Sequence, residues 1–162
     1  MNSHERAHTN SVTVALTREA GANDKLLSSI DKISKSTANV SCHELPCIKF
    51  SIGPDIDILR AEINLYDIIV LTSPQAASVF IDIWQECGKP DLKVVTVGKG
   101  TSKSLEKVGI KILFEPSDAT GESLANELPR ELGTTVLYPS SALADNSLVN
   151  KLDSRGFKVR IV

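Results

Sequence analysis

Apolar residues along the chain alternate between short β-branched runs and longer stripes with helical spacing. The first run covers residues 12–16 and predicts a buried strand. A helix is predicted next, because apolar side chains recur at the helical period at Leu26, Leu27, Ile30 and Ile33. Residues 40–45 predict a second strand, which is closed by Pro46. Together these segments predict one β-α-β unit.

The same alternation restarts at Pro54 and continues to the last residue. A predicted helix over 56–63 leads to the apolar run 68–71, which is typical of a strand at the centre of a sheet. The clearest apolar stripe follows and predicts a helix that ends at Gly88 and carries Ala76, Val79, Phe80, Ile83, Trp84 and Cys87. The later pattern predicts strands at 94–97, 110–114, 135–138 and 157–162, and helices that end at Gly109, Gly133 and Gly156.

Brief connections between alternating strands and helices favour right-handed crossovers and a parallel sheet with helices on both faces. About five strands between Tyr66 and Val162 predict an α/β fold with one complete flavodoxin-like layer. Residues 12–45 supply only about two strands, which is fewer than a stable sheet normally needs. We therefore expect this unit to belong to a sheet whose other strands this sequence does not contain.

Composition narrows the classes of function. The chain has 162 residues, 41% hydrophobic and 23% charged, and its formal net charge of −2 argues against a nucleic-acid partner. No apolar run approaches the ~20 residues of a membrane span, and the polar leader 1–11 lacks a signal-peptide core. Cys42, Cys47 and Cys87 form no C-x-x-C unit, which predicts reduced structural thiols and no metal site.

Several familiar active sites do not fit the pattern. Residues 98–102 resemble a P-loop, but they lack its earlier glycine and also lack the third glycine of a dinucleotide-binding turn. The histidines have no evident nucleophile to serve; they are His4, His8 and His43. Without a Ser-His-Asp group, a Cys-His group or paired carboxylates, an enzyme of this kind would act mainly by positioning its substrate.

Polar residues gather where the predicted strands end, and in doubly wound sheets ligands bind beyond the carboxyl ends of the strands. The candidate binding residues are Thr17, Arg18, Thr72, Ser73, Lys99, Thr101, Ser140 and Ser141. Free backbone N–H groups at the following helix N-termini would favour an anion. In the simpler interpretation the Ser and Thr side chains cap the next helix, while Arg18 and Lys99 are solvated loop charges. Capping does not exclude contact with a ligand.

Six short motifs, in order and with suitable gaps, resemble the uroporphyrinogen-III synthase family, and plant-type members in particular. They are VALTR at 14–18, ELP at 44–46, YDIIVLTSP at 66–74, VG at 97–98 with Thr101, ATGESL at 119–124 and VLYPS at 136–140. Each motif alone is weak, because similar strand ends occur across α/β proteins. Their common order and spacing carry the resemblance from about residue 12 to the end.

The resemblance implies two flavodoxin-like domains, one inserted into the other, with substrate bound between them. Residues 1–11 would then be a polar leader, 12–47 the first part of a discontinuous domain, and 48–162 the inserted domain. The chain would be truncated at its C-terminal side. The return linker, the rest of the first domain and a family tyrosine that assists loss of the substrate hydroxyl would lie beyond Val162.

The resemblance also implies an activity, the lyase reaction that closes hydroxymethylbilane to uroporphyrinogen III with inversion of ring D, in haem and chlorophyll biosynthesis. It implies no cofactor, no metal and no membrane or nucleic-acid partner, and we expect a monomer. The candidate residues above would hold the acetate and propionate arms, with Thr17 and Arg18 contributed by the first domain, and no catalytic residue is assigned. A plant-type member would work in the chloroplast, and any other in the cytoplasm.

Two alternatives stay open on the sequence alone. A truncated chain would be an inactive fragment or isoform, acting at most as an anion-binding α/β module. An unrelated flavodoxin-like sensor domain is the other alternative, although its expected acidic or phosphate-loop signatures are missing. If the truncation is real, we expect little synthase activity and exposed apolar surface over residues 12–45.

Overall fold

The computed structural model describes residues 11–36 and 39–162. The chain divides into two compact units, a first one that ends at Ser51 and a second one, Ile52–Val162. The predicted discontinuous domain concerns sequence that this chain does not include, so it stays a prediction. His4 and His8 lie outside the described residues.

The first unit is a single β-α-β unit, as predicted. Its elements are β1 (Ser11–Leu16), α1 (Asp24–Ser36) and β2 (Asn39–Glu44). The two strands are parallel, with Val12 opposite Val40 and Leu16 opposite Glu44. Helix α1 lies against this two-stranded sheet, and its side chains Leu27 and Ile30 are half-buried.

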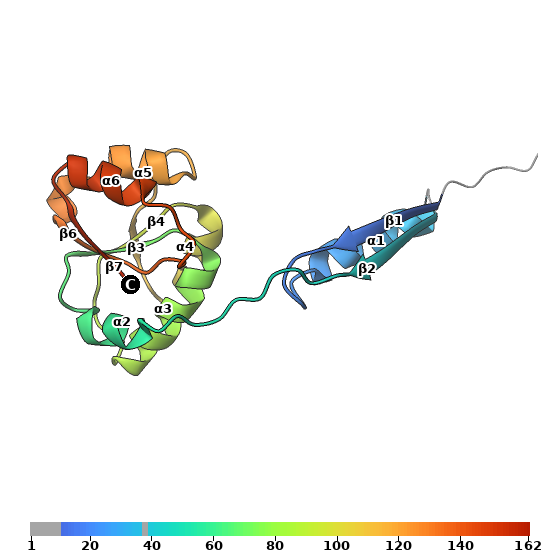
Figure 1. Ribbon diagram of the computed structural model, residues 1–162, viewed down its shortest axis with the longest axis horizontal. Helices are drawn as coiled ribbons and strands as arrows, with labels where there is room; N and C mark the ends of the chain where they lie inside the picture. Colours follow the sequence, from blue (N-terminus) through green and yellow to red (C-terminus); the bar gives the residue numbers. More distant parts are fainter. Residues whose placement is uncertain (1–10, 37–38) are drawn as a thin grey trace, which may run out of the picture. The chain divides into compact units, whose positions relative to one another are not determined.

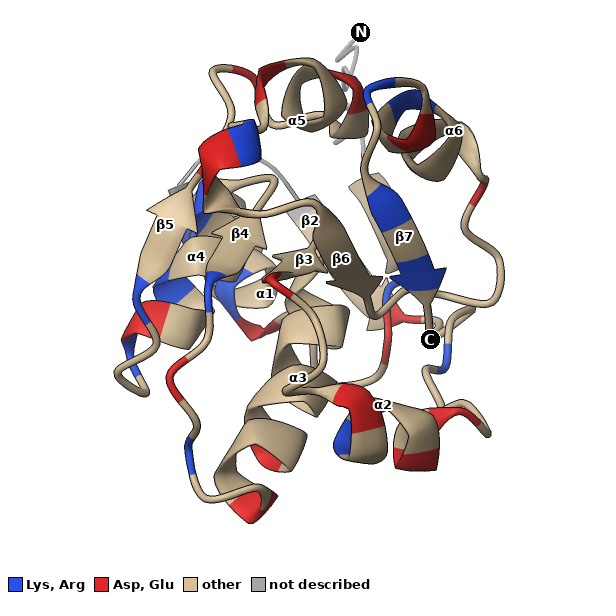
Figure 2. Cartoon of the chain, turned by 90° about the vertical axis from the view of Figure 1, so that its left-hand side faces the viewer, with Lys and Arg blue, Asp and Glu red and all other residues tan. Residues whose placement is uncertain are grey.

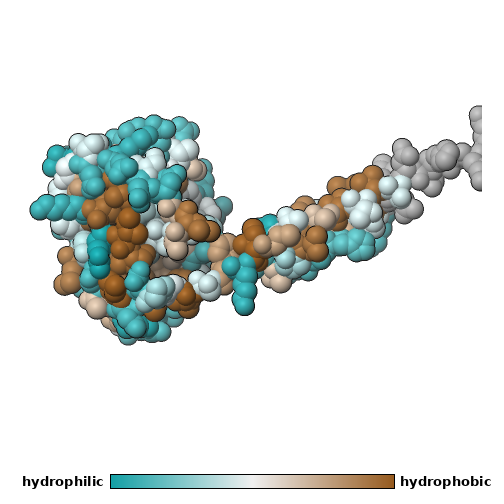
Figure 3. Space-filling view, viewed as in Figure 1, coloured by the Kyte–Doolittle hydropathy of each residue, from teal (hydrophilic) through white to brown (hydrophobic). Residues whose placement is uncertain are grey.

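Burial in the first unit is shallow, and the prediction that residues 12–16 form a buried strand is wrong. Leu16 is the one buried apolar side chain among its described residues, at 6% exposure. Large apolar side chains are open to solvent at Val12, Leu26, Ile33 and Leu45. Figure 3 shows apolar surface along this unit. A two-stranded sheet with one helix has no second layer that would cover its free face, and this is the physical reason for the exposure.

The second unit follows the predicted alternation of helices and strands (Figure 1). Its helices are α2 (Ile56–Glu62), α3 (Pro74–Glu86), α4 (Lys99–Glu106), α5 (Gly121–Glu127) and α6 (Ser147–Ser154), with a 3-10 turn η1 (Arg130–Leu132). Its strands are β3 (Ile68–Leu71), β4 (Val94–Thr96), β5 (Ile112–Phe114), β6 (Thr135–Tyr138) and β7 (Lys158–Ile161).

The five strands form one parallel sheet in the order β5-β4-β3-β6-β7. The prediction that residues 68–71 form the central strand is confirmed, and β3 is buried along its whole length. Numbered along the chain, the strands run 3-2-1-4-5, whereas the flavodoxin order is 2-1-3-4-5. The sheet is therefore parallel and of the α/β class, as predicted, but its strand order differs from that of flavodoxin. A hydrophobic pattern predicts strands and crossovers, but it does not say on which side of β3 each later strand is added.

Helices cover both faces of this sheet, as predicted. One face packs against α2, α3 and α4 in a core that contains Phe80, Trp84 and Leu105. The other face packs against α5 and α6 in a core that contains Leu124 and Leu152. Alternate residues of β3 supply the two cores, because successive side chains of a strand point to opposite faces. Figure 1 shows α5 and α6 on one side of the sheet and α2 and α3 on the other.

The edge strand β7 is short and carries the basic residues Lys158 and Arg160, and its ribbon has blue segments in Figure 2. Charges on an edge strand discourage pairing with another chain. Arg160 is also fixed to α2, since its Nε lies 3.3 Å from a carboxylate oxygen of Glu62. The edge is therefore tied to the second unit's own helices.

The helix that was predicted to end at Gly133 is shorter than expected. It ends at Glu127, because Pro129 disfavours the helical conformation of Leu128, whose ψ is 120°. The guanidinium of Arg155 donates to the freed carbonyl groups of Ala125 and Leu128, the latter at 3.1 Å. This contact ties the C-terminus of α5 to the turn after α6.

Candidate functional site

The carboxyl ends of the parallel strands bring several of the predicted residues to one edge of the second unit. Leu71 lies opposite Thr96, and Val97 N donates to Leu71 O at 3.3 Å, so the turns after β3 and β4 are adjacent. On the other side, Ser140 N donates to Val162 O at 2.9 Å, which joins the turn after β6 to the end of β7. We call this edge, with the turns at 72–73, 97–101 and 139–146, the carboxyl edge.

The direction of the chain across the sheet reverses between β3 and β6. From β3 the chain continues to β4 and β5 on one side, and it then returns to add β6 and β7 on the other. In open α/β sheets this switch point is where ligands bind. Thr72 Oγ1 lies 3.2 Å from the hydroxyl of Tyr138 at this place, so two hydroxyl groups meet at the switch point.

Ser73 is the N-cap of α3, as the simpler interpretation of this residue predicts. Its Oγ accepts a hydrogen bond from Ala76 N at 3.1 Å, and Pro74 occupies the first helical position. Proline has no N–H, so the N–H of Gln75 is the first-turn donor that neither the helix nor the cap satisfies. Ser73 is half-buried, so its hydroxyl also borders the carboxyl edge.

The turn after β4 presents Lys99 and Gly100, which are exposed, but not Thr101. Thr101 is buried at 4% exposure, and its N–H donates to Gly98 O at 2.9 Å. Gly98 itself is the N-cap of α4 and offers no side chain. Of the two predicted residues at this turn, Lys99 is therefore the accessible one.

A buried polar network beneath α4 was not predicted from the sequence. Thr96 Oγ1 and Ser102 Oγ lie 2.6 Å apart, and Ser102 Oγ also donates to a carboxylate oxygen of Glu115. Glu115 follows β5, so its negative charge lies near the first turn of α4 and offsets the anion preference of that helix end. A Ser four residues beyond the strand-end glycine Gly98 was the available signal, but spacing alone does not identify its partner.

The turn after β6 is shaped by its own serines. Ser141 Oγ accepts from Leu143 N at 3.2 Å, and Ser140 Oγ lies 3.4 Å from Ser141 O. Ser141 is exposed and Ser140 is half-buried, so both hydroxyls border the solvent. Neither caps α6, whose N-cap is Asn146. The capping interpretation therefore does not account for Ser140 and Ser141.

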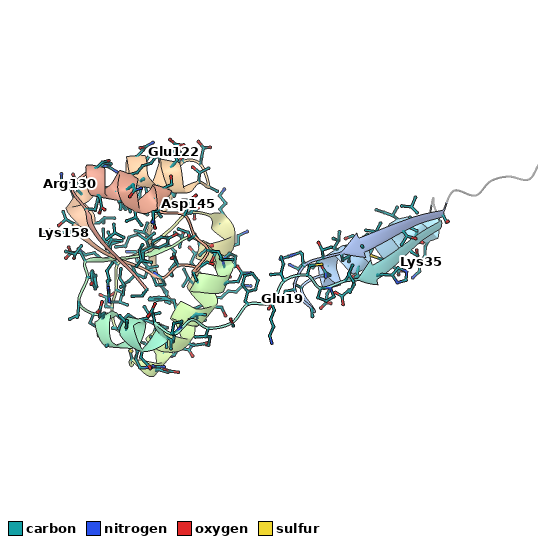
Figure 4. The ribbon with its side chains drawn as sticks, viewed as in Figure 1. Glu19, Lys35, Glu122, Arg130, Asp145 and Lys158 are labelled. Atoms are coloured by element: carbon teal, nitrogen blue, oxygen red, sulfur yellow. The ribbon has the colours of Figure 1, made fainter. Side chains whose placement is uncertain are left out.

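Thr17 and Arg18 lie at the carboxyl end of β1 in the first unit, and both are exposed. Arg18 Nη1 donates to Ala22 O at 3.3 Å, and Thr17 O accepts from Cys47 N at 3.2 Å. Glu19 follows them, and Figure 4 places Glu19 and Lys35 at opposite ends of this unit. The Thr17–Arg18 turn is therefore held by the Arg18 guanidinium and by a backbone bond to the segment after β2.

Asn23 closes the same turn and was missed by the sequence reasoning. It is 1% exposed, and its Nδ2 donates to a carboxylate oxygen of Glu44 at 2.9 Å. Its Oδ1 is a buried acceptor without a hydrogen-bond partner among the described atoms. An asparagine just before a helical stripe is a helix-start signal, which is how this residue could have been found.

The chemistry of the carboxyl edge is that of hydrogen-bond donors. Hydroxyl and N–H groups predominate there, Lys99 is its exposed cation, and Asp145, whose Oδ1 accepts from Ser147 N at 2.9 Å, is its exposed carboxylate. Within the described ranges, no group of three His, Cys, Asp or Glu side chains is placed to hold a metal ion, and Cys42, Cys47 and Cys87 are free thiols. Such an edge can orient an anionic ligand. It does not place a nucleophile next to a base.

No helix in the described part of the chain has both the length and the apolar character needed to cross a membrane.

Comparisons with known proteins agree on one family. A family model described as "Uroporphyrinogen-III synthase HemD" matches residues 15–162. The rice protein "Uroporphyrinogen-III synthase, chloroplastic" is 42% identical over 156 residues, which cover 90% of this chain and 50% of that protein. "Porphyrin biosynthesis protein HemD" of Ruminiclostridium josui is 31% identical over 125 residues, or 71% of this chain and 25% of that protein.

A solved structure gives the corresponding similarity of fold. The Thermus thermophilus uroporphyrinogen III synthase aligns with a TM-score of 0.55 at 15% identity, over 93% of this chain and 61% of that chain. This chain therefore spans half the length of the rice relative and about three fifths of the Thermus chain.

Proposed function

This chain belongs to the uroporphyrinogen-III synthase family, and from that membership we propose that it takes part in the closure of hydroxymethylbilane to uroporphyrinogen III with inversion of ring D. At the site, the proposal rests on the composition of the carboxyl edge. It gathers hydroxyl and N–H donors from several strand ends and contains no nucleophile with an adjacent base. That composition suits a reaction in which the substrate is already reactive and its geometry decides the product.

The substrate's acetate and propionate arms are the groups that such donors recognise. Hydrogen bonds to a carboxylate are stronger than those between neutral groups, so a few placed donors orient a flexible linear tetrapyrrole. In this proposal Thr72, Ser73, Ser140, Ser141 and Lys99 bind arms from the second unit. Thr101 contributes through the packing of the first turn of α4, because its side chain is buried.

Thr17 and Arg18 are proposed as the first unit's contribution. Arg18 is the one of the pair with a charge, and a guanidinium suits a carboxylate arm well. The architecture proposed with them is a discontinuous first domain that begins at residues 12–47, and an inserted domain at 48–162. The match covers half of the rice relative, which leaves room in that protein for the rest of such a first domain.

We further propose that the protein works as a monomer, without a cofactor, in the chloroplast. The location is supported by the printed name of the rice relative, which calls that protein chloroplastic.

The test is a product assay on the purified chain. Hydroxymethylbilane is supplied fresh, the products are oxidised, and the type I and type III isomers are separated. Type III above the spontaneous background supports the proposal, and it should fall in Thr72→Val but not in Ser154→Ala. Ser154 is a matched control, because its hydroxyl bonds to Lys151 O at the C-terminus of α6, before the start of β7 and away from the carboxyl edge.

A second candidate function is an anion-binding module without synthase activity. The observation that favours it is the first unit, where a two-stranded sheet leaves apolar side chains exposed. Type I product alone, together with measurable binding of a carboxylated tetrapyrrole, would support this candidate. Type III product would exclude it.

A further inference from the structure

Two hydroxyl groups with different surroundings meet at the switch point between β3 and β6. Thr72 Oγ1 and the hydroxyl of Tyr138 are 3.2 Å apart. Tyr138 is 6% exposed, and its ring packs in the core with α5 and α6. Thr72 follows β3 and is half-buried. Of the two, Thr72 is therefore the residue that can present its hydroxyl to a ligand at the carboxyl edge.

The direction of this hydrogen bond follows from acidity. The two hydroxyls carry two protons, and one of these protons lies between the oxygens. A phenol is a stronger acid than an aliphatic alcohol, so the favoured arrangement has Tyr138 donating to Thr72 Oγ1. The proton of Thr72 is then left free to be donated outward, and the bond that it accepts makes it a better donor.

The same bond restricts the orientation of Thr72. Threonine is β-branched and has few side-chain rotamers, and a fixed partner on Tyr138 selects one of them before any ligand arrives. A donor that is already oriented loses less entropy when it binds. Tyr138 is itself held by its strand and by the surrounding core, so it is a rigid support for Thr72.

Resting on the proposed function, we propose that Tyr138 is a positioning residue. It donates its phenolic proton to Thr72 and thereby aims the Thr72 hydroxyl at a carboxylate arm of the tetrapyrrole substrate. Tyr138 itself does not touch the substrate. A purely structural role is the competing explanation, in which Thr72 only satisfies a buried phenol. Removal of the phenol would then change stability without changing affinity.

The experiment is a double-mutant cycle on affinity, with the full 162-residue chain and uroporphyrin III as the probe. This stable octacarboxylate resembles the product and does not react, and its fluorescence reports binding. Thr72→Val should weaken binding about tenfold, the usual effect of one lost bond to a charged group. Tyr138→Phe keeps the ring and should weaken binding about threefold. Thr72→Ser keeps the hydroxyl and should bind within about twofold of the wild type.

The double variant decides between the two roles. If Tyr138 acts through Thr72, the double variant binds like Thr72→Val alone, because the phenol has nothing left to position. Thermal melting of every variant confirms folding, and Thr72→Ala replaces Thr72→Val if the valine does not fit. Unchanged affinity in Tyr138→Phe, or losses that simply add in the double variant, would overturn the positioning role while wild-type binding stands. No binding by the wild type would overturn both the positioning role and the proposed site.

Discussion

At the scale of single residues, Asp67 holds the starts of the two central strands together. Its Oδ2 accepts hydrogen bonds from Thr135 N at 3.0 Å, from Thr134 N at 2.9 Å and from Thr135 Oγ1 at 2.8 Å. Thr135 Oγ1 in turn accepts from Asp67 N at 3.0 Å. These bonds favour the charged carboxylate, and they lower the pKa of Asp67 below its ordinary value, with Lys93 adding a smaller contribution of the same sign.

The lowered pKa of Asp67 predicts an acid-sensitive contribution to stability. A carboxylate whose pKa is lower in the folded state stabilises the fold above its unfolded pKa, and this contribution is lost as pH falls through the folded pKa. Asp67→Asn keeps the shape but not the charge. We expect the wild type to melt at a higher temperature than Asp67→Asn at about pH 7, and the difference to shrink as the pH falls below about 3.9, the ordinary pKa of an aspartate. A difference independent of pH would contradict this role of the charge.

Gly133 is constrained by its close approach to Asp67. Its φ is 138°, a conformation that side chains rarely adopt, and an added Cβ would lie 2.2 Å from Cβ of Asp67. Gly133→Ala should therefore cost at least about 2 kcal/mol of unfolding free energy, measured by urea denaturation. Gly88→Ala is the control, since Gly88 also has a positive φ but no atom within 4 Å of the added Cβ. Equal losses in the two variants would show that the contact with Asp67 does not matter.

At the scale of the elements, Ser73 shows how one residue can begin a helix and border a site. Its cap on Ala76 N stabilises the first turn of α3, and the loss of such a cap costs about 1 kcal/mol. Ser73→Ala should lower stability by about that amount. Ser73→Asp restores the cap and suits the helix dipole, so it should recover stability.

The same pair of variants separates capping from binding. The added charge of Ser73→Asp should repel a carboxylate arm and weaken uroporphyrin III binding roughly tenfold, although the fold is as stable as the wild type. Thr135→Val is the control, because Thr135 Oγ1 bonds to Asp67 at the amino ends of β3 and β6, opposite the carboxyl edge, and should change stability alone. Wild-type affinity in a well-folded Ser73→Asp would remove Ser73 from the site.

The sequence predicted elements better than it predicted their arrangement. Hydrophobic periodicity located the helices and strands of the second unit, since a buried stripe leaves a local pattern. The order of the strands depends on contacts between distant segments, and the periodicity contains no information about them. The site shows the same division: strand ends revealed Thr72 and Ser73, but the partner of Thr72 is Tyr138, 66 positions along the chain, which the sequence indicated only as a strand residue.

At the scale of the whole molecule, the two units differ in how much apolar surface they bury. The second unit has a five-stranded sheet with a core on each face. The first has a two-stranded sheet, and among its described residues only Leu16 and Asn23 are buried. A parallel sheet is normally covered on both faces, and a two-stranded one is marginal by itself. Local stability should therefore differ sharply within one chain.

This difference predicts that residues 52–162 fold alone. The isolated segment should unfold in one cooperative transition at nearly the melting temperature of that unit in the full chain, because both of its cores lie within the segment. In the full chain, amide hydrogen exchange should be slow in β3 and β6 and fast in β1 and β2, where opening exposes little additional surface. Protection of β1 and β2 equal to that of β3 would mean that the first unit is stabilised by contacts beyond its own β-α-β unit.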